Sequence, residues 1–392
     1  MTRPPTGSSS ALAERLPFPF ARPVVPRPEA WLDYLTASYD QRWFANGGPA
    51  VCQLEAALAA DIGGGRDVVA CASATAGITA VLLALQVRGP VAVPAFTFPA
   101  TVAALEQAGC TPVFCDIDAQ TLELDAIDVT RAIDQFGCVA VLHVRAFGFC
   151  HDLEPVARAA AVAGVPLVVD AAAAFGGSTP DGLPVGRDGI AEVFSFHASK
   201  VFAVGEGGAI ATTPELAAQV RHVANFAIDG GDVTTRATNA KLPELAAAVA
   251  LAMRDQLDAH VATRREAALE LVDVAIGHAI DLAHLAAGSP PMQCLPIVLD
   301  TADARAAFVA ALEIDGIEAR TYYCPGLHRA TAWREAPGAD RDLPVTEDLA
   351  SRPACVPLYS DLEGADLGFF ARALERALDV AAGTSLTIGR AA

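Results

Sequence analysis

Short apolar segments alternate with longer, more mixed segments along the chain from about residue 50. The apolar segments predict buried strands at Val68–Cys71, Val91–Val93, Pro112–Cys115, Val139–Val144 and Pro166–Asp170. Helices are predicted between them at Gln53–Ala60, Thr75–Gln86, Pro99–Gln107, Leu124–Gln135 and Asp152–Ala163. Continuous apolar strands separated by helices are typical of a parallel sheet that helices cover on both faces. The pattern therefore predicts an α/β protein with a mostly parallel sheet.

The pattern changes after residue 170. Two further strands are predicted at Val193–Phe196 and Ala209–Thr212. Residues Glu244–Ile276 contain no proline or glycine, which predicts a long helix or a closely spaced pair that connects two domains; its Arg264-Arg265 is interpreted as a solvated helix face. Beyond it we expect strands at Cys294–Leu299 and Ile317–Arg320, and helices at Ala302–Ile314 and Leu367–Val380, with a frayed C-terminus. The expected division is an N-terminal arm (1–45, loose over its first dozen residues), a large domain (46–255) and a smaller C-terminal α/β domain (256–392).

Composition and charge exclude several classes of protein. Of the 392 residues, 53% are hydrophobic, enough for a sizeable core, and the formal net charge of −19 argues against a nucleic-acid partner. The longest apolar stretches, such as Ala159–Val169, are interrupted by glycine and proline, so no membrane-spanning helix is expected. Residues Met1–Pro23 contain five prolines and no continuous apolar core, so no signal peptide is expected. The nine cysteines form no Cys-x-x-Cys pair, and we expect reduced, mostly buried thiols and no metal site. The expected location is the cytoplasm.

Ser73-Ala-Thr75 stands where a strand is predicted to pass into a helix. Free backbone N–H groups at a helix N-terminus bind phosphate, and small side chains let the anion approach. Any small-residue turn before a helix has the same pattern, so the signal is weak alone. No Gly-x-Gly-x-x-Gly follows a strand, which disfavours a Rossmann dinucleotide site.

Asp170 closes the apolar strand that contains Val168 and Val169, and Ala171-Ala-Ala-Ala174 follows it. A carboxylate in this place must pair with a positive group or lie half exposed at the end of the strand. Ligands bind at that end in open α/β sheets. The alternative is a helix N-cap or a solvated aspartate in a loop.

Lys200 stands among apolar residues in Phe194-Ser-Phe-His-Ala-Ser-Lys200-Val-Phe202, which leads to Gly205-Glu-Gly-Gly208. Lysine is seldom buried without a function. Desolvation lowers the pKa of a lysine, and Schiff-base chemistry needs the neutral amine. A structural lysine whose amine reaches solvent is the alternative. Together with Asp170 and the upstream phosphate site, Lys200 fits a single cofactor.

About ten blocks between Asn46 and Tyr359 occur in the order found in one protein family. The blocks are Asn46-Gly-Gly with Leu54-Glu55, Ser73-Ala-Thr75-Ala, Pro94-Ala-Phe-Thr-Phe98-Pro-Ala-Thr101, Val113-Phe-Cys-Asp-Ile-Asp118, Asp170-Ala-Ala, Ser195-Phe-His-Ala-Ser-Lys200, Gly205-Glu-Gly-Gly208, Arg320-Thr-Tyr-Tyr-Cys-Pro325 through His328, and Pro357-Leu-Tyr359. In these blocks the chain resembles the DegT/StrS sugar aminotransferases, which are fold-type I pyridoxal-phosphate enzymes. The lysine block with its Gly-Glu-Gly-Gly is the most specific.

The resemblance implies a role for each matched residue. Lys200 is expected to bind pyridoxal 5'-phosphate as a Schiff base, and Asp170 to keep the pyridine nitrogen protonated. Phe98 is expected to stack on the ring. Ala74, Thr75 and Ser195 are expected to hold the phosphate. The further residues implied are Asn239 of the partner subunit for the phosphate, with Lys241 bringing a positive charge, and His197, Arg320 and His328 as candidate substrate contacts. An ordinary hydrogen-bonding role is the alternative for His197.

Three departures from the family pattern concern the substrate. The usual glutamine near the phenolic oxygen of the cofactor is Ala173, and a frequent histidine two positions later is Phe175. The partner-subunit block Asn-Tyr-Arg-Met is Asn239-Ala-Lys-Leu242. These departures leave open a specialised member that does not take the usual nucleotide-linked sugar.

The predicted function is transamination. An amino acid, glutamate or glutamine by analogy with the family, would give its amino group to a ketone of a sugar or sugar-like natural-product intermediate. The predicted unit is a homodimer with shared active sites. A lyase, cyclase or dehydratase on the same scaffold is the alternative, although the family's dehydratases have histidine in place of the lysine. A non-catalytic regulator is the other alternative, and the presence of both Lys200 and Asp170 argues against it.

Overall fold

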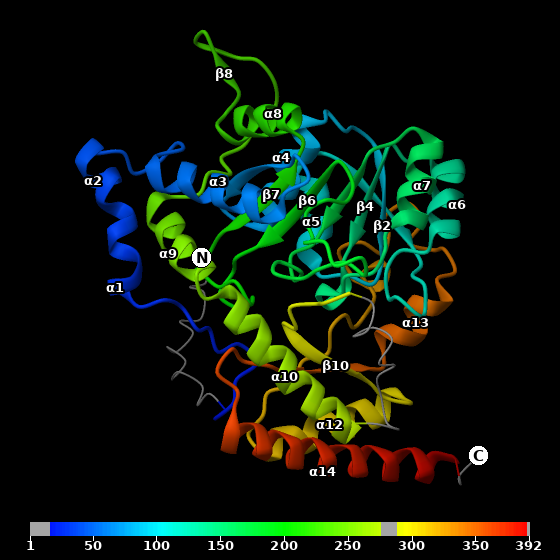
Figure 1. Ribbon diagram of the computed structural model, residues 1–392. Helices are drawn as coiled ribbons and strands as arrows, with labels where there is room; N and C mark the ends of the chain where they lie inside the picture. Colours follow the sequence, from blue (N-terminus) through cyan, green and yellow to red (C-terminus); the bar gives the residue numbers. More distant parts are fainter. Residues whose placement is uncertain (1–15, 276–287, 390–392) are drawn as a thin grey trace, which may run out of the picture.

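The computed structural model describes residues 16–275 and 288–389, and a seven-stranded sheet is its central layer (Figure 1). The strand order is β1-β7-β6-β5-β4-β2-β3. The strands are β1 (Asp67–Cys71), β2 (Pro90–Pro94), β3 (Thr111–Cys115), β4 (Ala140–Val144), β5 (Leu167–Asp170), β6 (Ala191–Ser195) and β7 (Gly208–Thr212). Neighbouring strands are parallel except at β7, which runs antiparallel to both β1 and β6. This sheet confirms the predicted α/β class.

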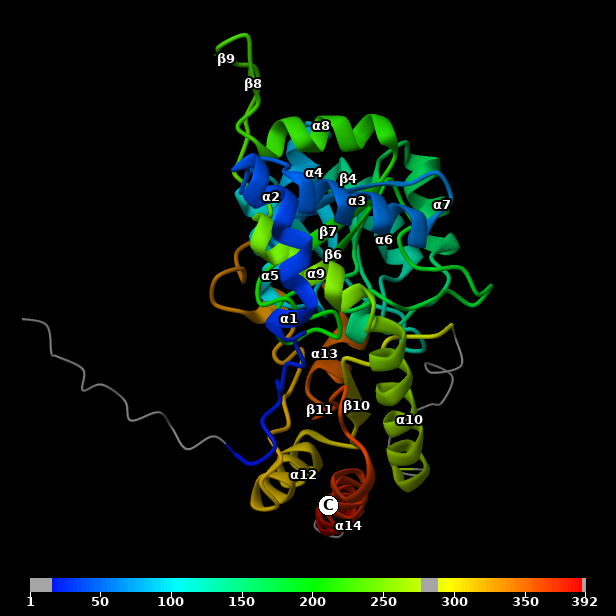
Figure 2. The ribbon, with the colours of Figure 1, turned by 60° about the vertical axis from the view of Figure 1, so that its left-hand side comes forward.

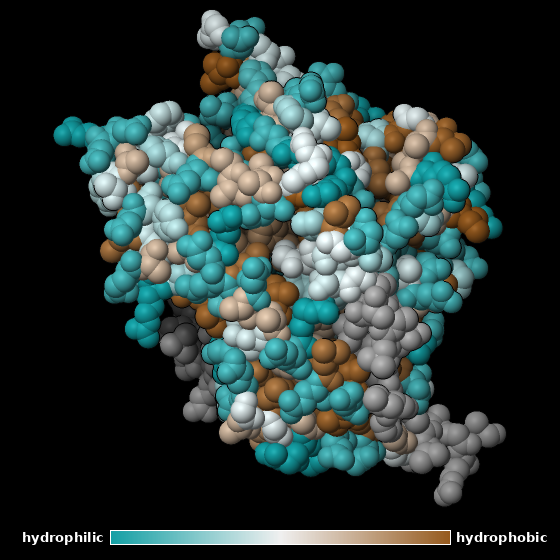
Figure 3. All heavy atoms as spheres, viewed as in Figure 1, coloured by the Kyte–Doolittle hydropathy of each residue, from teal (hydrophilic) through white to brown (hydrophobic). Residues whose placement is uncertain are grey.

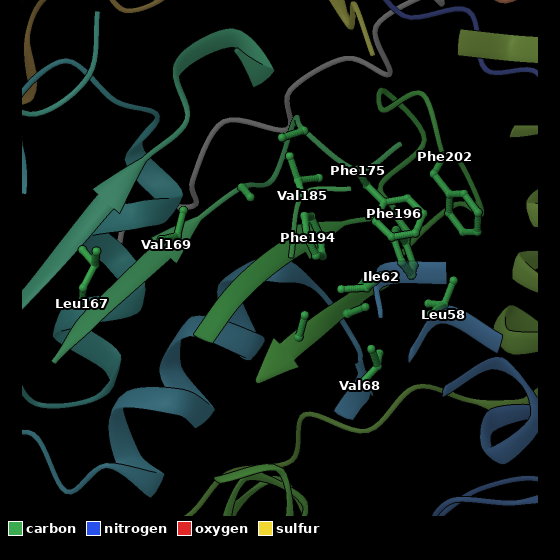
Figure 4. Packing of buried hydrophobic residues seen from close by; sticks show 14 of the residues in the cluster. Leu58, Ile62, Val68, Leu167, Val169, Phe175, Val185, Phe194, Phe196 and Phe202 are labelled. Atoms are coloured by element: carbon green, nitrogen blue, oxygen red, sulfur yellow. The ribbon is translucent and has the colours of Figure 1, made fainter. Parts of the chain in front are cut away.

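Helices cover both faces of the sheet because consecutive strand residues point to opposite sides. Val168 packs in the hydrophobic cluster with helices α4 (Ala74–Ala84), α5 (Pro99–Gln107) and α8 (Pro214–Ala224). Val169 packs in the other cluster, with α3 (Pro49–Ile62), α6 (Ala126–Phe136), α7 (Glu154–Ala163) and α9 (Glu244–Arg254). Figure 4 shows part of the second cluster, where residues of α3 and of β1, β5 and β6 meet. The strands are therefore buried on both faces, as their uninterrupted apolar sequences require.

A smaller layer lies below the sheet in Figures 1 and 2. It consists of the antiparallel pair β10 (Cys294–Val298) and β11 (Pro353–Pro357), with α12 (Ala302–Ile314) and α14 (Gly364–Gly389). Helix α10 (Leu257–Ala275) packs on α14 and follows α9 closely, so the predicted connector is a pair of helices. Leu271, Phe308 and Phe370 belong to the separate core of this layer.

The C-terminal part departs from the sequence prediction in three places. Residues Ile317 and Arg320 form single bridges to Phe18 and Cys355 rather than a strand. Strand β11 was not predicted, although its prolines stand only at the ends of an apolar run. Helix α14 begins at Gly364 and continues to Gly389, beyond its predicted end at Val380. The helix α13 (Pro344–Ala350) and the short helix η3 (Leu327–Arg329) complete this part. The predicted loose tail over the first dozen residues lies outside the described residues.

The N-terminal segment and one hairpin project from the two layers. The helices α1 (Pro28–Trp31), η1 (Leu32–Leu35) and α2 (Thr36–Gln41) lie beside α9, and β8 (Ile228–Asp229) and β9 (Asp232–Val233) form a hairpin that stands clear of the body (Figures 1 and 2). All nine cysteines are free thiols, and seven of them are buried, as predicted. Within residues 16–275 and 288–389, no helix has both the length and the apolar character to cross a membrane.

Candidate functional site

The register of the sheet brings the predicted site segments to one edge. Parallel β5 and β6 end there at Asp170 and Ser195. Because β7 is reversed, it begins at the same edge, and Gly208 pairs with both Ser195 of β6 and Cys71 of β1. The turn after β1 leads directly into α4. The carboxyl ends of three strands, the lysine loop and a helix N-terminus therefore meet at this edge, the place where ligands bind in open α/β sheets.

The N-terminus of α4 has the form of a phosphate site. Ser73 caps the helix, since its Oγ accepts a hydrogen bond from the N–H of Ala76 (3.2 Å). The first N–H groups of a helix, here those of Ala74 and Thr75, have no acceptor within the helix and can bind an anion. A Cβ on Gly208 would lie 3.0 Å from the Ala74 nitrogen and 2.5 Å from the Phe194 oxygen. Glycine at this position therefore keeps β7 close to the turn without filling it.

Asp170 is buried at the end of β5 and held by two donors. Thr101 Oγ1 donates to its Oδ2 (2.8 Å), and the N–H of Ala172 donates to its Oδ1 (3.1 Å). Thr97 Oγ1 in turn lies 2.8 Å from Thr101 Oγ1. Burial raises the pKa of Asp170, and these hydrogen bonds and the charge of Lys200 oppose the shift. A buried carboxylate held in one orientation is suited to pair with a protonated ring nitrogen.

Lys200 lies in the tight loop between β6 and β7. Its N–H bonds to the carbonyl of His197 (2.8 Å), and further backbone bonds close the loop, from Ala198 to Gly205 and from Phe196 to Gly207. Burial lowers the pKa of the Lys200 amine, and Asp170 and Cys294 oppose that shift. The amine Nζ donates to Gln293 Oε1 (3.0 Å). The residue thus has the lowered pKa that Schiff-base formation needs.

Two phenylalanines have opposite surroundings. Phe98 is the N-cap residue of α5, and 51% of it is exposed. Its ring is edge-on to that of Tyr322, with 6.0 Å between the ring centres, so one face is available to a ligand. Phe175, which stands where the family has histidine, is buried among Phe194, Phe196 and Phe202 (Figure 4). Its ring belongs to the core beneath the lysine loop, so this position offers no polar contact.

The segment that carries Asn239 lies beside the turn before α4. The carbonyl of Ala240 accepts a hydrogen bond from the N–H of Ala72 (2.8 Å), and Lys241 bridges to Cys71. Asn239 is exposed. The amine of Lys241 donates to Asn225 Oδ1 (2.7 Å) and lies 4.4 Å from the centre of the Phe226 ring. Lys241 is therefore engaged within its own chain.

The three candidate substrate contacts lie in different surroundings. His197 is exposed, and its Nδ1 accepts from the N–H of Ser199 (3.1 Å). Arg320 Nε donates to Glu318 Oε1 (3.1 Å), and its guanidinium lies 4.8 Å from the centre of the Phe20 ring. His328 is buried, 3.4 Å from Glu347 Oε1, and burial lowers its pKa. No hydrogen bond or ion pair between described residues links His328 to Lys200 or Asp170, so its role as a substrate contact stays a prediction.

Sequence reasoning missed three residues around the site. Thr101 belongs to a matched block, and its spacing from Phe98 was the available signal for its contact with Asp170. Gln293 had no local signal, because its partner is 93 positions away. Arg264 is buried rather than solvated, which corrects the interpretation of Arg264-Arg265. Its guanidinium donates to the carbonyl of Leu358 (2.8 Å) and to Ser360 Oγ (2.8 Å), and these hydrogen bonds compensate for its burial.

The residues at the sheet edge fit a phosphorylated pyridine. A helix N-terminus can take the phosphate, a buried aspartate can face the ring nitrogen, and a desolvated lysine can take the carbonyl carbon. The fold and the arrangement of these residues are those expected of a fold-type I pyridoxal-phosphate enzyme.

The comparisons with known proteins specify the class further. The model of the DegT/DnrJ/EryC1/StrS aminotransferase family matches residues 28–374, and the chain belongs to this family. It is 31% identical to Protein Rv3402c of Mycobacterium tuberculosis, over 92% of this chain and 90% of that protein. It is 28% identical to a UDP-2-acetamido-2-deoxy-3-oxo-D-glucuronate aminotransferase of Pseudomonas aeruginosa, over 83% and 90%. The crystal structure of DesI with its TDP-sugar product has a TM-score of 0.86 and 32% identity, over 96% of each chain. The protein is an aminotransferase.

Proposed function

We propose that this aminotransferase uses pyridoxal phosphate to move an amino group from glutamate or glutamine to a ketone of a sugar or sugar-like intermediate. The observation that carries the proposal is the meeting of Lys200, Asp170 and the N-terminus of α4 at one edge of the sheet. The similarity to DesI and to the Pseudomonas aminotransferase supports a sugar ketone as the acceptor. The replacement of the family's glutamine and histidine by Ala173 and Phe175 leaves the particular sugar open.

Each residue of the site has one task in this reaction. When bound, pyridoxal phosphate supplies the carbon that carries the amino group and a ring that accepts electrons. Lys200 Nζ takes the Cα proton of the donor and returns it, and proton transfer by a positioned base contributes about 10²–10⁴-fold. Asp170 holds a proton at the ring nitrogen. Ala74, Thr75 and Ser195 hold the phosphate, and Phe98 covers one face of the ring.

A panel of ketones tests the proposed acceptor. Protein loaded with pyridoxamine phosphate would be mixed separately with a nucleotide-linked keto-sugar, a cyclitol ketone and small α-keto acids. The absorbance of the aldehyde form of the cofactor, pyridoxal phosphate, would be followed in each mixture. We expect the keto-sugar or the cyclitol ketone to regenerate that form faster than the α-keto acid derived from the amino donor. A response to α-keto acids alone would contradict a sugar-like acceptor.

We also propose a homodimer. Exposed apolar side chains occur at the projecting hairpin and on the N-terminal segment, which lie toward the same side in Figure 2, and Figure 3 shows hydrophobic atoms exposed on the hairpin. These side chains are Phe226, Ile228 and Val233 of the hairpin region, and Leu32, Tyr39, Trp43 and Phe44 of the N-terminal region. Exposed apolar clusters of this kind mark protein interfaces. A second copy that covers them would bring Asn239 to the partner's phosphate site.

A mixing experiment tests whether the sites are shared. As single variants, Lys200→Ala is expected to be inactive and Asn239→Ala is expected to retain the cofactor weakly. After co-refolding, half of the dimers are mixed and each has one site with both residues intact, so activity should return to about a quarter of the wild-type value. If activity stays at the level of the two parents, Asn239 acts within its own chain.

We propose that the protein acts in the cytoplasm. We further propose that the boundary between the large domain (46–255) and the small domain (256–392) falls between α9 and α10. The separate hydrophobic core around Leu271 and Phe308 supports this division.

A further inference from the structure

The amine of Lys200 has a partner from the C-terminal part of the chain. Nζ donates to Gln293 Oε1 at 3.0 Å. Lys200 lies in the loop between β6 and β7, whereas Gln293 directly precedes β10 in the smaller layer. Both side chains are partly buried. The hydrogen bond therefore joins the reactive amine to the part of the chain beyond α10.

Gln293 is itself held in place by a buried arginine. Arg264, in the middle of α10, donates from Nη1 to the carbonyls of Gln293 (3.2 Å) and Leu358 (2.8 Å). Its Nε donates to Ser360 Oγ (2.8 Å). The carbonyl of Pro290 accepts from Arg265 Nη1 (3.3 Å). Helix α10 thus holds the backbone that carries Gln293, and the side-chain amide reaches Lys200 from this fixed position.

The neutral amide suits the chemistry of Lys200. One carboxylate already acts on the amine by charge, that of Asp170 on β5. A second carboxylate at the place of Gln293 would favour the ammonium form strongly, whereas an amide oxygen orients the amine and adds no net charge. An amide can therefore orient the Lys200 amine while burial still lowers the pKa of that amine.

We propose that Gln293 is a positioning residue that holds the amine of Lys200 whenever this amine is not joined to the cofactor. The proposal rests on Lys200 being the Schiff-base lysine of the proposed function. The segment before β10 would then contribute to the active site through Gln293, and Arg264 would hold this segment in place through its hydrogen bond to the Gln293 carbonyl.

The test is the pH dependence with which acetic anhydride modifies Lys200 in protein loaded with pyridoxamine phosphate. The chain contains two lysines, Lys200 and Lys241, so peptide mass spectrometry follows each amine separately. Gln293→Glu is expected to raise the midpoint for Lys200 by about one pH unit or more, because a carboxylate favours the ammonium form. Gln293→Met is expected to lower it by about half a unit or more, because the ammonium form loses an acceptor.

Matched controls separate positioning from a general loss of structure. The same two substitutions at Gln120, an exposed glutamine, should leave the midpoint unchanged, and Lys241 serves as a reference in every sample. Thermal unfolding shows which variants are folded, and either folded Gln293 variant is sufficient. A midpoint that fails to move in the expected direction in a folded variant overturns the proposal. Labelling needs no transamination, so failure of the proposed function would appear separately, as a borohydride adduct away from Lys200.

Discussion

Replacement of Lys200 by alanine is expected to abolish transamination and also the borohydride-stable attachment of pyridoxal phosphate. Burial lowers the pKa of this amine, which favours the neutral nucleophile, and no second lysine lies in the lysine loop. Wild-type protein, reduced with borohydride and digested, should carry the cofactor on the peptide that contains Lys200. Absorbance of the Schiff base should be present in the wild type and absent from Lys200→Ala.

Lys241 provides the matched control, because it is the other lysine of the chain and hydrogen-bonds to Asn225. Lys241→Ala should keep the reducible adduct on Lys200. An adduct that maps to Lys241 in the wild type, or that persists in Lys200→Ala, would show that the reactive lysine has been misassigned.

Asp170→Asn is expected to lower turnover by about 10²–10⁴-fold, as the loss of a buried charge partner costs about 3–5 kcal/mol. The amide can occupy the same space without the negative charge if its oxygen accepts from the Ala172 N–H and its NH2 donates to Thr101 Oγ1, which can then donate to Thr97 Oγ1 instead. A neutral amide cannot keep a proton on the ring nitrogen. Cofactor content should therefore change little, whereas the rate of the half-reaction with glutamate or glutamine should fall.

The half-reaction is measured by stopped-flow absorbance at saturating amino donor, and cofactor content is measured after denaturation. Asp303→Asn, at an exposed position near the start of α12, is the control for an aspartate remote from the site. Turnover within a few-fold of the wild type in Asp170→Asn would mean that Asp170 does not face the ring nitrogen.

The large sheet could be predicted because its strands are continuous apolar runs. Burial on both faces restricts such a segment to apolar residues, which makes its ends easy to locate in the sequence. Both ends of each strand from β2 to β7 lie within two residues of the predicted bounds. The site residues Lys200 and Asp170 could be predicted for a related reason, because charged residues are rare within apolar segments. Their meeting at one edge follows from the parallel arrangement of the strands.

The contacts from the C-terminal part could not be predicted from the sequence. Whether Arg264 is solvated or buried depends on the carbonyl of Leu358, which is 94 positions away, and on that of Gln293, and no local sequence pattern indicates these contacts. The same holds for Gln293, whose amide meets Lys200 only after both layers have formed. Ile317–Arg320 has the composition of a strand, yet it forms only single bridges to Phe18 and Cys355.

The reversed strand β7 has a consequence for the order in which the site is assembled. The lysine loop is closed by the pairing of β6 with β7, which are near neighbours in sequence and can pair early. The turn before α4 reaches Gly208 only through the pairing of β1 with β7, the most distant pairing of this sheet along the chain. Phosphate affinity should therefore appear late in refolding, after the lysine loop has formed. Binding of the cofactor during refolding would then report that β1 has paired with β7.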